Sequence, residues 1–266
     1  MKKILGVIVI IIGLLILQNC GLLSAAGFSS QGLSVKKVSK DLALDDTISS
    51  VTINHDEWTV LLKKHVNENG FVNYKNFIND RDALKSYLQK LATYQPNNSW
   101  SVHEQLAYYI NVYNAQTVNL ILENYPTKSI KNISGQWTRA FVAIGDKNFS
   151  LGGIENSLLR KMNEPRIHFA INCASYSCPM LLNEAFTASN IDAQLDIVTR
   201  NFINSNKNDI TANTPRVSQL FNWYKKDFLA NGTTSVIEYI NKYSDVKINV
   251  NASLQFKDYN WKLNEQ

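Results

Sequence analysis

The sequence predicts an α+β fold, a single helix-rich domain with a small sheet. Two observations predict it: apolar residues recur at helical spacing over several long stretches, and a few shorter stretches are typical of strands. The length of 266 residues is enough for one domain with a sizeable core. Since no internal repeat and no second domain can be recognised, we expect one globular unit.

Composition narrows the class of protein. Hydrophobic residues make up 45% of the chain and charged residues 18%, which is typical of a folded protein and excludes disorder. The net charge of +5 is mild and the lysines are spread along the chain, so no nucleic-acid partner is expected. Three cysteines are too few for a disulfide scaffold.

The N-terminus is typical of a signal peptide, which we place at residues 1–26. Two lysines precede an apolar run over residues 4–17 that is shorter than the roughly 20 residues that span a bilayer. Two processing routes compete. One is cleavage after Ala26, and the other is lipid attachment at Cys20, although Asn19 departs from the small residue expected there. Either route predicts export to a bacterial periplasm or anchoring in the envelope, with membrane contact only through this segment.

The first part of the mature chain divides into a linker and the start of the domain. Residues 27–48 are rich in Ser, Lys and Asp with weak periodicity, so they are interpreted as a linker. The globular domain is expected to occupy residues 49–266. Apolar residues at helical spacing predict helices over 58–66 and over 74–91.

The clearest helix begins at Ser101. Ser101 and Glu104 have the spacing of a capping box, in which both side chains satisfy free backbone donors. An apolar stripe continues to Ile121. Beyond it, the stretches 141–144 and 148–151 flank a Gly-Asp pair and predict a hairpin.

The second half of the chain is predicted to hold one strand and three helices. Residues 166–172 alternate as a strand. The stretches 185–202, 221–229 and 235–243 have helical patterns.

One histidine lies close to two cysteines and forms the candidate site. His168 is followed by Cys173 and Cys178, and a thiol beside an imidazole is the pairing that nucleophilic catalysis uses. On an extended strand, His168 shares a face with Arg166 and Asn172, so Asn172 could orient the imidazole, and both Arg166 and Asn172 could bind the substrate. Cys173 would point to the opposite face, about 16 Å away. The Ser-rich loop gives Cys178 the easier route to His168, so Cys178 is the favoured nucleophile.

Four more residues are candidates for the same site. Glu155 could orient His168, as a carboxylate does in a catalytic triad. Asn111, Tyr113 and Asn114 lie together in the capped helix, where asparagine is a poor helix former. They could pack in the core or line a substrate site. The other three histidines are expected at the surface.

Other interpretations of the cluster remain open. His168 and the two cysteines could be structural core residues. Cys173 and Cys178 could form a disulfide in the periplasm. Together with His168 they could also bind zinc, although the spacing matches no standard zinc pattern. No glycine-rich phosphate loop is present, and no cofactor is predicted.

Several stretches taken together resemble the bacterial exported branch of the family called domain of unknown function 547. The resemblance covers about residues 55–263. It rests on short segments that occur in the family's order, namely Gly70 to Tyr74, Glu104 to Ala115, Tyr125-Pro126, Ile154-Glu155, Pro165 to Ala170, Cys178-Pro179, Trp223-Tyr224 and Asp227-Phe228.

The resemblance implies no assigned activity. A helix followed by a histidine-bearing strand is distantly similar to papain and transglutaminase, but Ser101 and His103 stand where those folds have a cysteine. The leading hypothesis is an exported thiol-dependent hydrolase or transferase with His168 as the base. The alternative is a non-catalytic envelope module with a structural His/Cys cluster. The expected partner is an unknown small molecule or an envelope protein.

Overall fold

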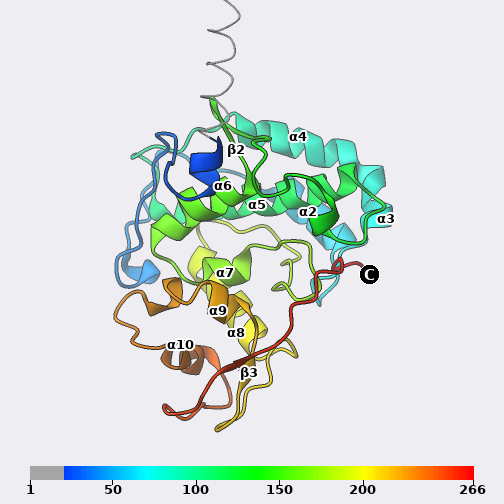
Figure 1. Ribbon diagram of the computed structural model, residues 1–266. Coiled ribbons are helices and arrows are strands. Elements are labelled where there is room, and N and C mark those ends of the chain that lie inside the picture. The colour runs from blue at the N-terminus through cyan, green and yellow to red at the C-terminus, as the bar shows by residue number, and fades with distance from the viewer. Residues whose placement is uncertain (1–20) are drawn as a thin grey trace, which may run out of the picture.

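The computed structural model describes residues 21–266 and shows a helix-rich α+β domain (Figure 1). The predicted signal peptide over 1–26 therefore lies outside the described residues, except for residues 21–26. The chain contains two small two-stranded sheets, and the predicted fold class is confirmed.

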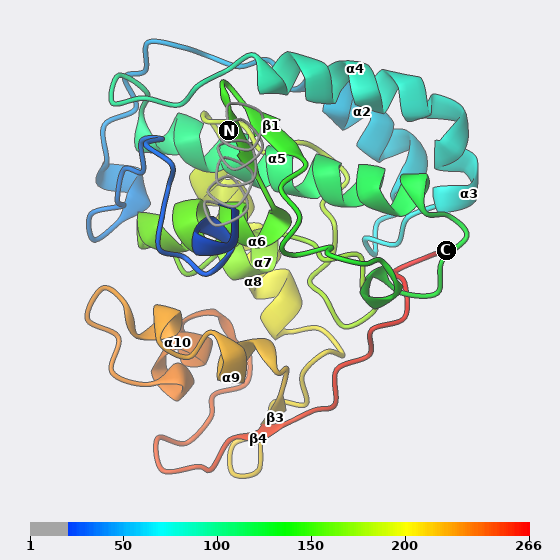
Figure 2. The ribbon, with the colours of Figure 1, turned by 45° about the horizontal axis from the view of Figure 1, so that its top comes forward.

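The N-terminal helices pack around one long buried helix (Figures 1 and 2). They are α2 (Asp56–His65), α3 (Tyr74–Phe77) and α4 (Arg81–Ala92), and the buried helix is α5 (Val102–Glu123). These elements confirm the helices predicted from residue 58 to residue 121. Almost every side chain of α5 is buried, so this helix is the centre of the core.

The capping box at the start of α5 is only half formed. Ser101 Oγ accepts a hydrogen bond from the backbone N–H of Glu104 at 3.1 Å, as predicted. The Glu104 carboxylate does not return to Ser101. It accepts from the backbone N–H of Ile53 at 3.0 Å and so ties the incoming chain to the helix.

The predicted hairpin is confirmed. Strands β1 (Val142–Ile144) and β2 (Lys147–Phe149) pair antiparallel around Gly145, whose φ of +56° is easily adopted by glycine. A continuous helical segment follows, formed by α6 (Leu151–Gly153), the π-helix η4 (Ile154–Leu158) and the 3-10 helix η5 (Leu159–Met162).

The strand predicted over 166–172 is wrong. Residues 167–170 form the short helix α7 (Ile167–Ala170), and the backbone N–H of Ile171 donates to the carbonyl of Ile167 at 3.0 Å. The chain becomes extended only at Ile171. All four side chains of α7 are buried, and a short, wholly buried apolar run fits a helix as well as a strand.

The C-terminal half confirms the three predicted helical stretches. It contains α8 (Ile191–Ile203), α9 (Leu220–Trp223) with η6 (Asp227–Leu229), and α10 (Val236–Tyr243). Strands β3 (Arg216–Val217) and β4 (Gln255–Phe256) pair in parallel. The remaining 3-10 turns are η1 (Leu42–Leu44), η2 (Ile78–Asp80) and η3 (Ile130–Asn132).

The last residues return to the N-terminal helices (Figure 2). Backbone hydrogen bonds join Val72 N–H to Asn264 O at 2.8 Å and Gln266 N–H to Val72 O at 3.1 Å. The C-terminal segment thus connects the two halves of the domain and passes the candidate site on its way.

The segment predicted as a linker, 27–48, lies against the domain. Leu33, Val38 and Leu42 are buried in the core, and the N–H of Val38 donates to the carbonyl of Met162 at 2.7 Å. The prediction missed this because isolated apolar residues among Ser, Lys and Asp give no periodic signal. Among residues 21–266, no helix combines the length and the apolar character that crossing a membrane requires.

The three histidines expected at the surface are buried. His55 Nδ1 and the hydroxyl of Tyr87 are 2.6 Å apart, and burial lowers the pKa of His55 to about 4. His65 Nε2 lies 2.6 Å from the carboxylate of Asp80. His103 is also buried. Polar partners allow His55 and His65 to leave the surface, whereas Nδ1 of His103 is buried without a hydrogen-bond partner among the described residues.

Candidate functional site

A cavity of about 360 Å³ gathers most of the predicted catalytic residues. Glu155, His168, Cys173 and Cys178 line it, together with Tyr113 from α5. We call it the thiol cavity. Its residues come from α5, the π-helix, α7 and the loop after it, and the two C-terminal segments around residues 220 and 260.

The two sulfurs lie side by side in its wall. Cys173 Sγ and Cys178 Sγ are 3.0 Å apart, beyond the roughly 2.05 Å of a disulfide bond, so both are free thiols. The backbone N–H of Cys173 also donates to Cys178 Sγ at 3.0 Å. Cys173 is partly exposed, whereas Cys178 is buried.

The surroundings make the two thiols unequal. The hydrogen bond with Cys178 lowers the pKa of Cys173 to about 7, against the opposing effect of burial. The hydroxyls of Ser175, at 3.0 Å, and Tyr259, at 3.3 Å, add to this effect. Burial raises the pKa of Cys178. Since the thiolate is the nucleophile, the geometry favours Cys173 over Cys178, the reverse of the order expected from the sequence.

An aspartate orients His168. His168 Nε2 lies 2.8 Å from Asp227 Oδ2, and since a carboxylate only accepts, Nε2 carries the hydrogen. His168 Nδ1 is buried and has no partner among the described residues. The ring stacks on Tyr224, with centroids 3.9 Å apart. No hydrogen bond joins His168 to either sulfur within residues 21–266.

Asp227 is in turn held by Arg160. Arg160 Nε donates to Asp227 Oδ2 at 2.6 Å and Nη2 donates to Oδ1 at 3.1 Å. Burial opposes ionisation, but the hydrogen bonds from His168 and Arg160 prevail and lower the pKa of Asp227 to about 2. The carboxylate is therefore charged throughout the neutral range and fixes the imidazole.

Glu155 and Asn172 do not orient His168, so both predicted roles are wrong. The hydroxyl of Tyr224 donates to Glu155 Oε1 at 2.5 Å. Glu155 belongs to the π-helix η4, a form that is rare and frequent at functional sites. The sequence did contain a signal for the partners of His168 and Glu155. Asp227 and Tyr224 are three positions apart in the predicted helix 221–229, and residues three apart lie on the same face of a helix.

Part of the chain is similar to a known protein family. Residues 97–203 match the model of a family described as "Protein of unknown function, DUF547". Over these residues, which are less than half of the chain, the protein is similar to the DUF547 family. The matched segment contains α5, Glu155, His168 and both cysteines, and it is shorter than the expected 55–263. No curated protein and no solved structure matches this chain.

Two asparagines of the DUF547 segment hold the backbone together instead of lining the thiol cavity. Asn114 Nδ2 donates to Ala170 O at 2.9 Å, and Asn114 Oδ1 accepts from Asn172 N–H at 2.8 Å. Asn111 makes the same paired contact with the backbone of Phe186. These contacts are those of the packing alternative, and neither asparagine is among the residues that line the thiol cavity. Asn114 fixes the chain between His168 and Cys173.

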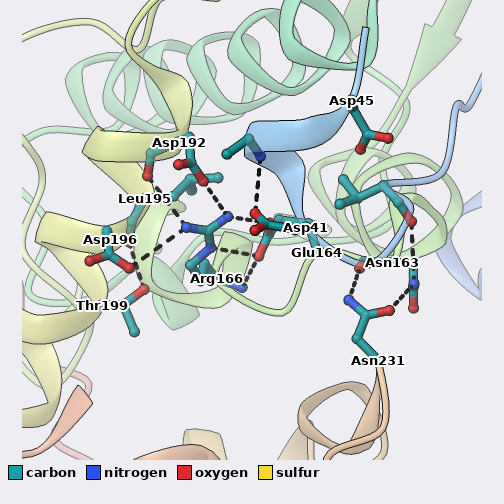
Figure 3. Close-up of polar contacts among 12 residues, drawn as sticks. Asp41, Asp45, Asn163, Glu164, Arg166, Asp192, Leu195, Asp196, Thr199 and Asn231 are labelled. Atoms are coloured by element: carbon teal, nitrogen blue, oxygen red, sulfur yellow. Dashed lines mark hydrogen bonds and ion pairs between the residues drawn. The ribbon is translucent and has the colours of Figure 1, made fainter. Parts of the chain in front are cut away.

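Arg166 also lies away from the thiol cavity, in an ion-pair network (Figure 3). Its guanidinium donates to both carboxylate oxygens of Glu164, at 2.9 and 2.7 Å, and to Asp192 Oδ1 at 2.8 Å. A longer contact of 3.7 Å reaches Asp196. Through these contacts Arg166 joins α7 to α8, and it is not among the residues that line the thiol cavity.

Asn172 shapes the cysteine loop. Its Nδ2 donates to Pro179 O at 2.6 Å and its Oδ1 accepts from Ala174 N–H at 2.8 Å. These bonds close the loop so that Cys178 returns to Cys173. Asn172 lines a second, larger cavity of about 840 Å³, which lies on the other side of Cys178 and Pro179.

The residues of the alternative zinc site have other partners. Within the described part of the chain, no three His, Cys, Asp or Glu side chains come together as a group that could hold a metal ion. His168 faces Asp227, the two sulfurs face each other, and Cys173 Sγ also contacts the hydroxyls of Ser175 and Tyr259.

Proposed function

We propose that this protein is a thiol-dependent hydrolase or transferase with Cys173 as its nucleophile. One observation carries the proposal. A partly exposed thiol with a pKa of about 7 lines the same cavity as an Asp227-oriented imidazole. A thiol that ionises near neutral pH needs no adjacent base, so the absence of a Cys173–His168 hydrogen bond is compatible with this chemistry.

The reaction divides into two steps. The Cys173 thiolate attacks the carbonyl carbon of an ester or amide, a thioester forms, and the bond to the leaving group breaks. His168, with Nε2 engaged by Asp227, donates a proton from Nδ1 to the leaving group and then takes a proton at Nδ1 from the attacking water or second nucleophile. Water, or a second nucleophile in a transferase, then attacks the thioester carbonyl. This step releases the product acid or transferred acyl compound and restores the thiol.

Alkylation kinetics test the nucleophile. We expect iodoacetamide to modify Cys173 with a rate that rises through pH 7, and peptide mapping identifies the labelled residue. Cys173→Ser should abolish the fast phase. Cys178→Ser should leave a reactive Cys173 whose pKa is higher, because the hydrogen bond that lowers it most is weakened. A native protein in which neither thiol reacts would overturn the proposal.

A generic acyl donor tests the chemistry. p-Nitrophenyl acetate should give a burst of nitrophenolate and an acetylated Cys173, and Cys173→Ser should give neither. Asp227→Asn should slow the turnover that follows the burst, since His168 loses its orienting partner. A burst that persists in Cys173→Ser would show that another group reacts.

The second candidate is a non-catalytic envelope module, and the aromatic lining of the thiol cavity favours it. In that case Cys173 and Cys178 serve packing or form a disulfide. The same experiment separates the two, because inert thiols together with ligand binding in the cavity would support the module and exclude the enzyme.

We also propose that the chain is exported and keeps residues 21–26. Ser24 is fully buried, its carbonyl accepts from Ser157 Oγ at 2.6 Å, and the carbonyl of Ala25 accepts from Asn156 Nδ2 at 2.8 Å. This packing supports lipid attachment at Cys20 over cleavage after Ala26. Mass spectrometry of the protein from bacterial membranes tests it, and a mature N-terminus at Gly27 would refute it.

A further inference from the structure

We propose that the thiol cavity binds an organic cation, the ammonium group of its substrate, between Glu155 and a wall of aromatic rings. This inference names the substrate class of the proposed enzyme, and its role in catalysis rests on that proposed function. The binding itself can be measured without any reaction.

The residues that line the cavity include one carboxylate. Among residues 21–266, Glu155 is the only Asp or Glu that lines the cavity, and no Lys or Arg lines it. Glu155 is 9% exposed and makes no ion pair within residues 21–266. One of its oxygens accepts a hydrogen bond from Tyr224, which leaves acceptor capacity on the carboxylate. Buried carboxylates are normally paired, so this one has the character of a receptor for a cation.

Aromatic rings form much of the cavity wall and can bind a cation. Among the described residues, six aromatic side chains line the cavity, and an ammonium group over such ring faces is attracted by their quadrupoles, most strongly when it is desolvated. The rings of Trp223, Tyr259 and Trp261 pack against one another with centroids 4.6 to 6.0 Å apart. The side chains are Tyr113, Trp137, Trp223, Tyr224, Tyr259 and Trp261.

Protein cations already contact two rings of this wall. Lys131 Nζ lies 5.2 Å from the ring of Trp261, and the guanidinium of Arg160 lies 5.3 Å from the ring of Tyr224, on which His168 also stacks. Neither Lys131 nor Arg160 lines the cavity. Trp223, at 46% exposure, is the ring most open to an approaching ligand.

Other ligand classes fit less well. An anion would meet the Glu155 carboxylate and the Cys173 sulfur with no lining cation to bind it. A neutral apolar ligand would fill the cavity but would leave the buried Glu155 carboxylate without a cation inside the cavity, because the nearby Arg160 guanidinium is not part of the lining. A cation satisfies both the rings and the carboxylate, and it places the attached chain in the cavity that Cys173 lines.

Binding of matched ligands tests the proposal. Choline and its neutral counterpart 3,3-dimethyl-1-butanol are titrated into the full chain, and binding is followed by calorimetry and by the fluorescence of the three lining tryptophans. We expect choline to bind about tenfold more tightly than the alcohol, and butylammonium to show the same preference over butanol. Equal affinities for each pair would overturn the proposal.

A variant identifies the carboxylate. Glu155→Gln keeps the shape and the hydrogen bond from Tyr224, and it should remove most of the preference for choline. Asp209→Asn, at an exposed ion pair with Lys257, is the matched control and should leave the preference unchanged. Thermal unfolding confirms that both variants fold. A preference that survives in folded Glu155→Gln would refute the role of Glu155.

The outcome is separable from that of the proposed function. The titrations are repeated with Cys173→Ser, which has no nucleophile and should still bind choline. Cation binding together with inert thiols would retain the cation site and reject the enzyme. Reactive Cys173 without cation selectivity would retain the enzyme and reject this substrate class.

Discussion

Replacing Asp227 by asparagine removes the charge that holds both His168 and Arg160. The Asp227 carboxylate accepts two hydrogen bonds from Arg160 and one from His168, and the Asp227 side chain is 21% exposed. Its pKa falls from 3.8 to about 2 on folding. At 1.36 kcal/mol per pKa unit, ionised Asp227 contributes about 2 kcal/mol to stability at pH 7.

The sign of the pH dependence follows from the lowered pKa. The contribution is complete above the unfolded pKa of 3.8 and is lost as the pH falls toward 2. Asp227→Asn should therefore lower the free energy of unfolding by about 2 kcal/mol at pH 7 and by roughly half of that at pH 3. For a domain of this size, the change at pH 7 corresponds to a fall in Tm of about 5 °C.

Circular dichroism at both pH values measures the effect. Asp209→Asn is again the control, because its carboxylate is half exposed and its ion pair with Lys257 should contribute about 0.5 kcal/mol or less. If Asp227→Asn destabilised the protein equally at pH 3 and pH 7, the loss would come from packing and the electrostatic argument would be refuted.

Three further changes have defined outcomes. Asn114→Ala leaves the N–H of Asn172 and a neighbouring carbonyl unpaired in the core, and urea unfolding should show a loss of about 3 kcal/mol. Tyr259→Phe removes a hydroxyl from Cys173 and should raise the pKa of that thiol, seen as alkylation about threefold slower at pH 7. Ser101→Ala removes the cap of α5 and should cost about 1 kcal/mol in thermal unfolding.

Local patterns predicted the helices and the hairpin because their signals lie within a few residues. Ser101 caps α5 through the N–H three residues later, and Gly145 turns the hairpin between adjacent strands. The pattern failed at α7, where every side chain is buried and neither period stands out. It failed again at 27–48, where isolated apolar residues join a core built by distant elements.

The reactive groups of the candidate site can be recognised in the sequence, but the residues that form hydrogen bonds with them cannot. His168, Cys173 and Cys178 occur within one short segment, so their chemistry can be recognised together. Asp227 lies 59 positions from His168, and Tyr259 lies 86 positions from Cys173. No local pattern specifies such pairs, since they depend on how α9, η6 and the C-terminal segment pack.

This division explains why the predicted roles of Glu155 and Cys178 changed. Glu155 and His168 both line the thiol cavity. Folding nevertheless brings Asp227 to the imidazole and leaves Glu155 hydrogen-bonded to Tyr224. Likewise, the loop that brings Cys178 next to Cys173 also buries Cys178. Burial raises the pKa of Cys178, and the hydrogen bond between the two thiols lowers the pKa of Cys173. The same packing that takes Glu155 away from the histidine leaves a buried carboxylate among aromatic rings, which is the arrangement that an ammonium group requires.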